Sequence, residues 1–181
     1  MFVIAGCNGA GKTTASYTVL PGIFECRNYV NSDEIASMLS PGRTGGASAI
    51  RASRLMLERM DELMERGEDF AVETTLATRT LLTTLANAQK HGYVVTLVFY
   101  WLRNPEAAVE RVRKRVESGG HNIPEATILR RYWLGIKHLR ELYMPMCDYW
   151  YIVDNNGPTG IMVAQGGRDL GTTVHNYAVY E

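Results

Sequence analysis

Residues 1–14 read MFVIAGCNGAGKTT, and this stretch decides the fold. The apolar run at residues 1–5 predicts a buried strand, and the next eight residues match G-x-x-x-x-G-K-[ST]. Glycines in such a loop let successive backbone N–H groups turn inward toward phosphate oxygens. The pattern therefore predicts a loop that binds phosphate groups between a strand and a helix.

The chemistry of this pattern assigns a task to each of its residues. Lys12 is expected to reach the β- and γ-phosphates of a nucleoside triphosphate, and the Thr13 hydroxyl is expected to ligate Mg²⁺. The helix predicted over residues 12–20, closed by Pro21-Gly22, would point the positive end of its dipole at the anion. The nucleotide-binding candidates are Gly6, Asn8, Gly9, Ala10, Gly11, Lys12, Thr13 and Thr14.

Size and composition favour one globular domain, residues 1–181, with 46% apolar and 21% charged residues. The formal net charge is zero, which makes nucleic acid or an anionic membrane an improbable partner. An odd count of three cysteines without metal-ligand spacing indicates a reduced setting. With no apolar run of membrane-spanning length and no signal-peptide pattern, we expect a cytoplasmic protein.

Strands and helices are predicted to alternate along the chain. The expected strands are 1–5, 29–31, 70–72, 93–102 and 149–153, and the expected helices are 12–20, 35–39, 49–66, 79–91, 104–117 and 124–143. Residues 155–181 are glycine-rich and are expected to add short β segments as a C-terminal extension. This order predicts an α/β, P-loop NTPase or kinase fold with a five-stranded, mainly parallel sheet covered by helices on both faces.

Polar residues follow several of these strands, at the sheet edge where ligands of such folds bind. Asp33 follows the second strand; it could accept a proton from an attacking hydroxyl, help to hold the water shell of the metal, or cap the next helix. Glu73 follows the third strand; it could bind an acceptor, hold the water molecules bound to Mg²⁺, or form a structural ion pair with Arg54 or Arg79.

A basic helix–loop–helix over residues 103–131 is a candidate lid. From Arg103 to Glu141 there are nine Lys or Arg residues against five Asp or Glu. Such a segment could close over a triphosphate and supply arginines, or its charges could form solvated i,i+4 pairs. Arg111 and Arg115 share one helical face, and the other lid candidates are His121, Arg130 and Arg131.

Taken together, several stretches resemble the zeta-toxin family of small P-loop kinases, especially its compact stand-alone members. They are residues 6–14, 30–34, Arg54 with 70–75, 91–93, 110–116, 119–124 and 130–132, and they span most of residues 2–154. The resemblance implies ATP- or GTP-dependent phosphorylation of a hydroxyl on UDP-N-acetylglucosamine or a related UDP-sugar, and a possible antitoxin partner.

By position, the resemblance also implies residue roles. Lys12 and Thr13 correspond to nucleotide and Mg²⁺ contacts, and Asp33 corresponds to the general base. Glu73 and Thr75 correspond to acceptor-binding residues, joined by Arg54, with Arg79 as a further candidate. Arg111 and Arg115 correspond to lid arginines that stabilise the γ-phosphate.

The sequence departs from the family pattern in the lid. Better-known members have a second lid arginine near the position of His121-Asn122, and this sequence has none there. Arg130 or Arg131 is the expected replacement.

Three functional hypotheses follow. The first is a kinase of a nucleotide-sugar or a similar hydroxyl acceptor. The second is a kinase of another acceptor, such as a nicotinamide nucleotide, an antibiotic or a nucleic-acid end. The third is a nucleotide-binding partner protein without transferase activity.

Overall fold

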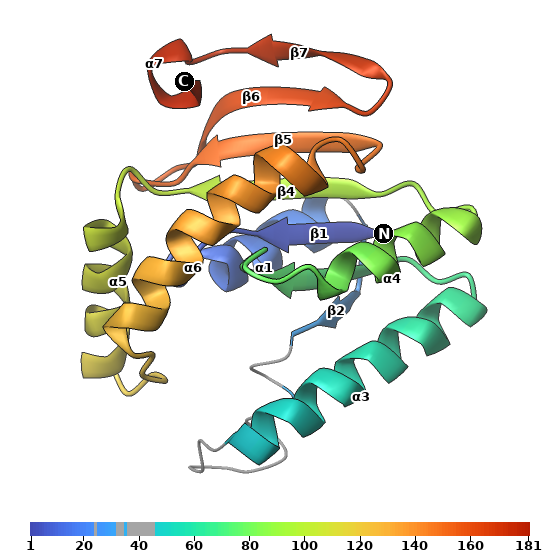
Figure 1. The fold of residues 1–181 in the computed structure, drawn as a ribbon, viewed down its shortest axis with the longest axis horizontal. Coiled ribbons are helices and arrows are strands. Elements are labelled where there is room, and N and C mark those ends of the chain that lie inside the picture. Colours follow the sequence, from blue (N-terminus) through green and yellow to red (C-terminus); the bar gives the residue numbers. More distant parts are fainter. Residues whose placement is uncertain (24, 32–34, 36–45) are drawn as a thin grey trace.

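The computed structural model describes residues 1–23, 25–31, 35 and 46–181. Its centre is a twisted sheet with the strand order β2-β3-β1-β4-β5-β6-β7 (Figure 1). The strands are β1 Phe2–Ala5, β2 Asn28–Val30, β3 Phe70–Thr74, β4 Thr96–Trp101, β5 Tyr149–Asp154, β6 Ile161–Gly167 and β7 Leu170–Val174. The pairs from β2 to β5 are parallel, and β6 and β7 continue the sheet antiparallel.

The expected mixed α/β fold with a mainly parallel sheet is confirmed, but the expected number of five strands is wrong. Over the described residues the sheet has seven strands, because the segment 161–174 forms a hairpin on β5. Most of β7 is exposed and β6 contains two glycines, so neither strand carries a clear apolar pattern. The position of this hairpin is fixed by backbone pairing with the edge of β5. Such pairing leaves little trace in the local amino-acid sequence.

The helices are α1 Lys12–Ile23, α3 Gly46–Glu65, α4 Thr80–Lys90, α5 Pro105–Glu117, α6 Glu125–His138, the π-helix η1 Leu139–Tyr143 and α7 Tyr177–Tyr180. Asn104 caps α5, as its sequence predicts, because its Oδ1 accepts a hydrogen bond from the Ala107 N–H at 2.8 Å. The predicted stop of the first helix at Pro21-Gly22 is wrong, because α1 continues to Ile23. Proline has a helix-compatible φ and removes only one backbone donor. The helix expected over residues 35–39 lies largely outside the described residues.

Two apolar clusters cover the two faces of the sheet. Val3 and Ala5 belong to one cluster, which contains residues of α3, α4 and η1. Ile4 belongs to the other, which contains residues of α5 and α6 and has Ala15 of α1 packed against it. This division follows from the alternation of side chains along a strand. In Figure 1, α4 and α1 lie on opposite faces, and α6 begins beside α5 and crosses in front of the strands.

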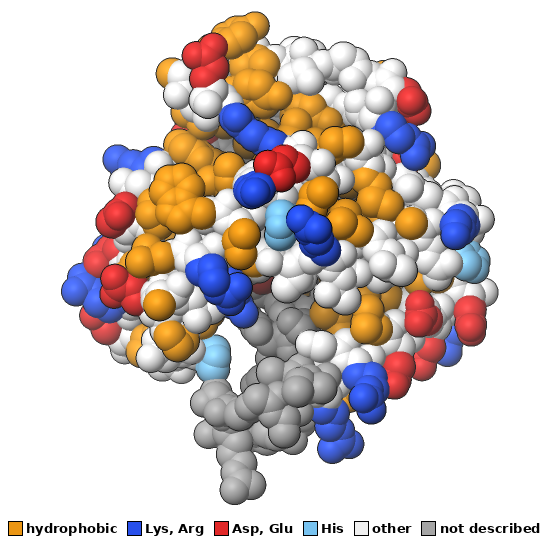
Figure 2. Space-filling model, viewed as in Figure 1, with side chains coloured by type: hydrophobic (Ala, Val, Ile, Leu, Met, Phe, Trp, Pro, Cys, Tyr) orange, Lys and Arg blue, Asp and Glu red, His pale blue; other side chains and the backbone are white. Residues whose placement is uncertain are grey.

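The surface charges are mixed. On the face shown in Figure 2, Lys and Arg side chains are interspersed with Asp and Glu, in keeping with the net charge of zero. Among the residues that the structure describes, every helix is too short or too polar to cross a bilayer.

The close packing of β6 on β5 makes Gly166 a test of the added hairpin. A Cβ at Gly166 would lie 2.5 Å from Cζ2 of Trp150, a buried residue of β5, whereas a Cβ at Gly171 would meet nothing within 4 Å. We expect Gly166→Ala to lower the free energy of unfolding by about 1–3 kcal/mol, because overpacking forces neighbours to shift. Gly171→Ala should leave it nearly unchanged, and urea denaturation of both variants measures the difference. Equal stability of the two variants would contradict this packing.

Candidate active site

The loop between β1 and α1 depends on glycine at three positions. Gly6, Gly9 and Gly11 have φ angles of 144°, 78° and 83°, which side-chain-bearing residues rarely adopt. A Cβ at Gly6 would also collide with the backbone carbonyl of Tyr100 in β4. Asn8 and Ala10 are buried within this loop, and Lys12, Thr13 and Thr14 form the first turn of α1. The backbone therefore has the geometry of a phosphate-binding loop.

Glu73, at the carboxyl end of β3, is the centre of a polar network. Its Oε2 accepts hydrogen bonds from Thr13 Oγ1 at 2.7 Å, from Asn31 Nδ2 at 3.3 Å and from the Tyr29 hydroxyl. Its Oε1 lies 3.6 Å from Lys12 Nζ. The side chain is only 11% exposed, so these partners stabilise a carboxylate that has lost most of its water.

Two other titratable groups beside the loop stay protonated at neutral pH. Burial, followed by the negative charge and hydrogen bond of Glu73, raises the pKa of Tyr29, so its hydroxyl remains a donor to that carboxylate. Burial raises the pKa of Cys7 to about 11, despite the nearby charge of Lys12. The Cys7 thiol is therefore not a nucleophile under these conditions.

The Lys12 ammonium is 6% exposed and has two anionic or polar partners. Its Nζ donates to the backbone carbonyl of Cys7 at 3.0 Å, in addition to the ion pair with Glu73. Lysine is a compact charge on a flexible stem, and here it lies inside the curve of the glycine loop. This arrangement directs positive charge to the place where the loop would hold phosphate.

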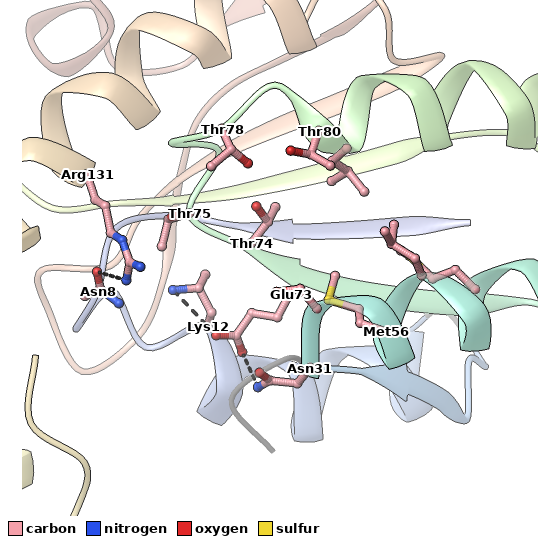
Figure 3. A pocket seen from close by; sticks show the side chains of 14 residues that line it. Asn8, Lys12, Asn31, Met56, Glu73, Thr74, Thr75, Thr78, Thr80 and Arg131 are labelled. Carbon is pink, nitrogen blue, oxygen red and sulfur yellow. Dashed lines mark hydrogen bonds and ion pairs between the residues drawn. The ribbon is translucent and has the colours of Figure 1, made fainter. Parts of the chain in front are cut away.

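A cavity of about 290 Å³ opens beside this network (Figure 3). In the view of Figure 3, Arg131 and Asn8 lie together on the left, and Thr78 and Thr80 lie along the top. Most of its lining residues are polar or charged, and the others form an apolar wall. The lining residues are Asn8, Lys12, Asn31, Ser53, Met56, Leu57, Met60, Glu73, Thr74, Thr75, Thr78, Thr80, Leu81 and Arg131. Among these residues the charged groups are Lys12, Glu73 and Arg131, so charge is concentrated near the glycine loop.

The arginines proposed for the lid differ in whether they reach the cavity. Arg131 Nη1 donates to Asn8 Oδ1 at 3.3 Å and lines the cavity, whereas Arg130 is exposed. Arg111 Nη2 instead donates to the backbone carbonyls of Asn155 and Asn156, at 2.8 and 3.1 Å.

Arg115 lies farther out on the same lid. Its Nη2 donates to the backbone carbonyl of His121 at 2.7 Å, and both side chains are exposed. Arg111 and Arg115 thus hold backbone segments, and Arg131 is the lid candidate that the structure brings to the cavity.

The expected acceptor-binding residues are also divided. Glu73 and Thr75 line the cavity, but Arg54 and Arg79 are exposed and are not among its described lining residues. Asp33 lies outside the described residues, so its role as general base stays a prediction.

Three polar residues at this site were not identified from the sequence. Tyr29 lies on β2 and Asn31 directly follows it, two positions further along the chain. Both side chains bond to Glu73, as strand alternation would place them, and this spacing is a signal that could have found them. Asn155 follows β5, and its Nδ2 donates to the backbone carbonyl of Ala10 at 2.7 Å. Its position at the carboxyl end of a strand was the available signal.

Comparison with solved structures supports the fold. A chain of the PezAT chromosomal toxin–antitoxin system of Streptococcus pneumoniae is 18% identical with a TM-score of 0.70, covering 100% of this chain and 77% of that chain. A chain in the crystal structure of AvrRxo1-ORF1:-ORF2 with ATP is 19% identical with a TM-score of 0.68. The match covers 99% of this chain, which spans 61% of the AvrRxo1 chain.

Sequence comparison identifies the family. An uncharacterized protein of Haemophilus influenzae is 28% identical over 127 residues, which are 70% of this chain and 88% of that protein. The family model described as zeta toxin matches residues 1–157, and these residues include the glycine loop, the Glu73 network and the cavity. The chain therefore belongs to the zeta-toxin family of P-loop kinases.

Proposed function

We propose that this kinase transfers the γ-phosphate of ATP or GTP to a hydroxyl of a small-molecule acceptor. Family membership suggests a UDP-sugar such as UDP-N-acetylglucosamine as the acceptor to test first. The observation that carries the proposal is the cavity itself, which begins at the glycine loop with Lys12 and Arg131 and continues between threonine hydroxyls and apolar side chains. Such a shape suits a γ-phosphate at the glycine loop beside the hydroxyl group of a second substrate.

The nucleotide half of the site consists of backbone donors and cations. The N–H groups of the glycine loop, the Lys12 ammonium and the Arg131 guanidinium would neutralise the β- and γ-phosphates, and charge of this kind lowers the barrier to phosphoryl transfer. Arg131, from α6, would fill the role of the second lid arginine, for which Arg130 or Arg131 was the expected replacement. Arg111 and Arg115 would support the loops around it through their bonds to backbone carbonyls.

The residues beside Lys12 fit a magnesium ion. Thr13 Oγ1 and the Glu73 carboxylate lie 2.7 Å apart, and Mg²⁺ prefers oxygen ligands of these kinds. Over the described ranges, no group of three His, Cys, Asp or Glu side chains could hold a metal alone, in agreement with an ion that shares phosphate oxygens as ligands. When bound, the ion would supply positive charge to the β- and γ-phosphates.

The acceptor half would provide the proton acceptor and the recognition groups. The acceptor oxygen would attack the γ-phosphorus, the bond from that phosphorus to the β,γ-bridging oxygen would break, and the hydroxyl proton would pass to the Asp33 carboxylate. Glu73 and Thr75 would bind the acceptor, and Arg54 and Arg79 remain candidates from the sequence alone. An antitoxin that binds this chain is a further proposal, supported by the likeness to a chain of the PezAT toxin–antitoxin system.

Incubation of the protein with ATP, Mg²⁺ and either UDP-N-acetylglucosamine or a metabolite pool tests the transfer, with mass spectrometry to detect products. We expect an acceptor that gains one phosphoryl group. Asp33→Asn should retain ATP binding and lose about 10²–10⁴-fold in transfer rate, because the amide cannot take the proton. ATP binding without any phosphorylated product would support the nucleotide-binding partner instead. Transfer by Asp33→Asn at the normal rate would remove Asp33 from the role of base.

Two adjacent arginines of α6 form a matched pair for the phosphate contact. Arg131→Ala should lower kcat by about 10²–10³-fold, the usual loss when one group that stabilises transition-state charge is removed. Arg130→Ala removes the same charge from an exposed position and should change kcat less than about twofold. Steady-state kinetics with the acceptor found above measures both. A large effect of Arg130→Ala, with none from Arg131→Ala, would reverse the assignment.

Glu73→Gln distinguishes magnesium binding from a purely structural role. The variant keeps the shape of the side chain but removes its charge beside Thr13 and Lys12. We expect it to bind Mg²⁺·ATP about tenfold more weakly and to bind ATP in EDTA at least as well as the wild type, because a negative charge near the phosphates is gone. Titration calorimetry in both buffers measures the two affinities. A loss of equal size in both buffers would indicate a structural role.

A further inference from the structure

The segment from the last residue of β3 to the first residue of α4, residues 74–80, lines one side of the cavity and is here named the acceptor loop. Its four threonines, Thr74, Thr75, Thr78 and Thr80, all contribute to the lining (Figure 3). Threonine hydroxyls donate and accept hydrogen bonds without charge, which suits recognition of hydroxyl groups on an acceptor. The loop is therefore placed to contact an acceptor bound in the cavity.

The backbone of the acceptor loop is strained at one position. Leu76 has a φ of 56°, a left-handed conformation that is uncommon for a residue with a branched side chain. Its N–H donates to Thr74 Oγ1 at 3.0 Å, and its side chain is fully buried in the core. Strained residues of this kind persist when surrounding contacts hold them in place.

Contacts from α6 and η1 hold the loop through its backbone carbonyls. His138 Nδ1 donates to the carbonyl of Leu76 at 2.7 Å, and the Tyr143 hydroxyl donates to the carbonyl of Thr78 at 2.8 Å. His138 is 7% exposed and its bond to Leu76 is buried, so this bond does not compete with bulk water. Tyr143 is fully buried, but its partner Thr78 is exposed, and the bond between them is half-buried.

Gly135 makes the approach of the two elements possible. A Cβ at this position would lie 2.6 Å from the carbonyl oxygen of Thr75, so the loop packs directly on the backbone of α6. Arg131, Gly135 and His138 are four and three residues apart and therefore share one face of the helix. The face that contacts Asn8 of the glycine loop thus also supports the acceptor loop.

We propose that His138 and Tyr143 are positioning residues that fix the acceptor loop and thereby set the affinity for the acceptor, without touching it. The proposal rests on the proposed function for its kinetic consequence, because it assumes that the cavity takes the acceptor. Loss of either bond would remove one restraint on the loop and allow the strained segment to relax, and loss of the His138 bond would also leave the buried carbonyl of Leu76 unpaired. The binding site for the nucleotide would keep its geometry.

Tyr143→Phe removes one hydroxyl, and Tyr132→Phe is its matched control. The Tyr132 hydroxyl donates to the backbone carbonyl of Leu102 at 2.7 Å, so each variant loses one hydrogen bond from a tyrosine hydroxyl to a backbone carbonyl. We expect Tyr143→Phe to raise the KM for the acceptor about five- to tenfold and to leave the KM for ATP unchanged. Tyr132→Phe should change neither KM, although its thermal stability falls by a similar amount.

Gly135→Ala is a second variant, which shifts the acceptor loop by adding a methyl group to α6. Its new methyl group would displace the Thr75 carbonyl, and we expect the same selective rise in the KM for the acceptor. An equal rise in the KM for the acceptor in Tyr132→Phe and Tyr143→Phe would overturn the proposal, because general destabilisation would then explain both effects.

Hydrogen–deuterium exchange measures the loop directly and needs no activity. In Tyr143→Phe the amides of residues 76–80 should exchange faster than in the wild type, with unchanged exchange at residues 8–13. In Tyr132→Phe the loop should exchange as in the wild type. Unchanged loop exchange in Tyr143→Phe, or faster exchange with an unchanged KM for the acceptor, would overturn the proposal. If the wild type phosphorylates no acceptor, the proposed function fails, and exchange alone still decides whether these residues fix the loop.

Discussion

The arrangement of the site depends on one buried carboxylate. Glu73 joins the ends of β2 and β3 to the first turn of α1, through Tyr29, Asn31, Thr13 and Lys12. A carboxylate so removed from water is stable only with several donors and a nearby cation, and removing one partner leaves the others uncompensated. The same contacts that stabilise this charge therefore fix Lys12 and Thr13 where a nucleotide would need them.

Much of the fold is predictable from the sequence because its signals are local. Positive φ angles require glycine at Gly6, Gly9 and Gly11, and the apolar strands of a parallel sheet stand out from their surroundings. The hairpin of β6 and β7 is different. Its strands are held by pairing with β5 and with each other, and a short exposed edge strand such as β7 has no apolar face to detect.

The site was predictable in its chemistry but less so in its geometry. Lys12, Thr13 and Glu73 come together because parallel strands end at one edge. The choice between Arg111 and Arg131 depends on how α5 and α6 pack, and this packing is set by contacts distant in the sequence. Arg111 bonds to carbonyls more than forty residues away, and Arg131 reaches Asn8, which lies 123 residues earlier.

Helix α6 touches both halves of the cavity, since Arg131 contacts the glycine loop while Gly135 and His138 contact the acceptor loop. A rigid helix cannot move at one of these points without moving at the other. Occupancy of one half by its substrate would therefore alter the free energy of filling the other. Such linkage is thermodynamically reciprocal, so each substrate would change the affinity of the protein for the other substrate by the same factor. If both halves bind substrate as proposed, cooperativity between the two ligands would arise from one helix without domain closure.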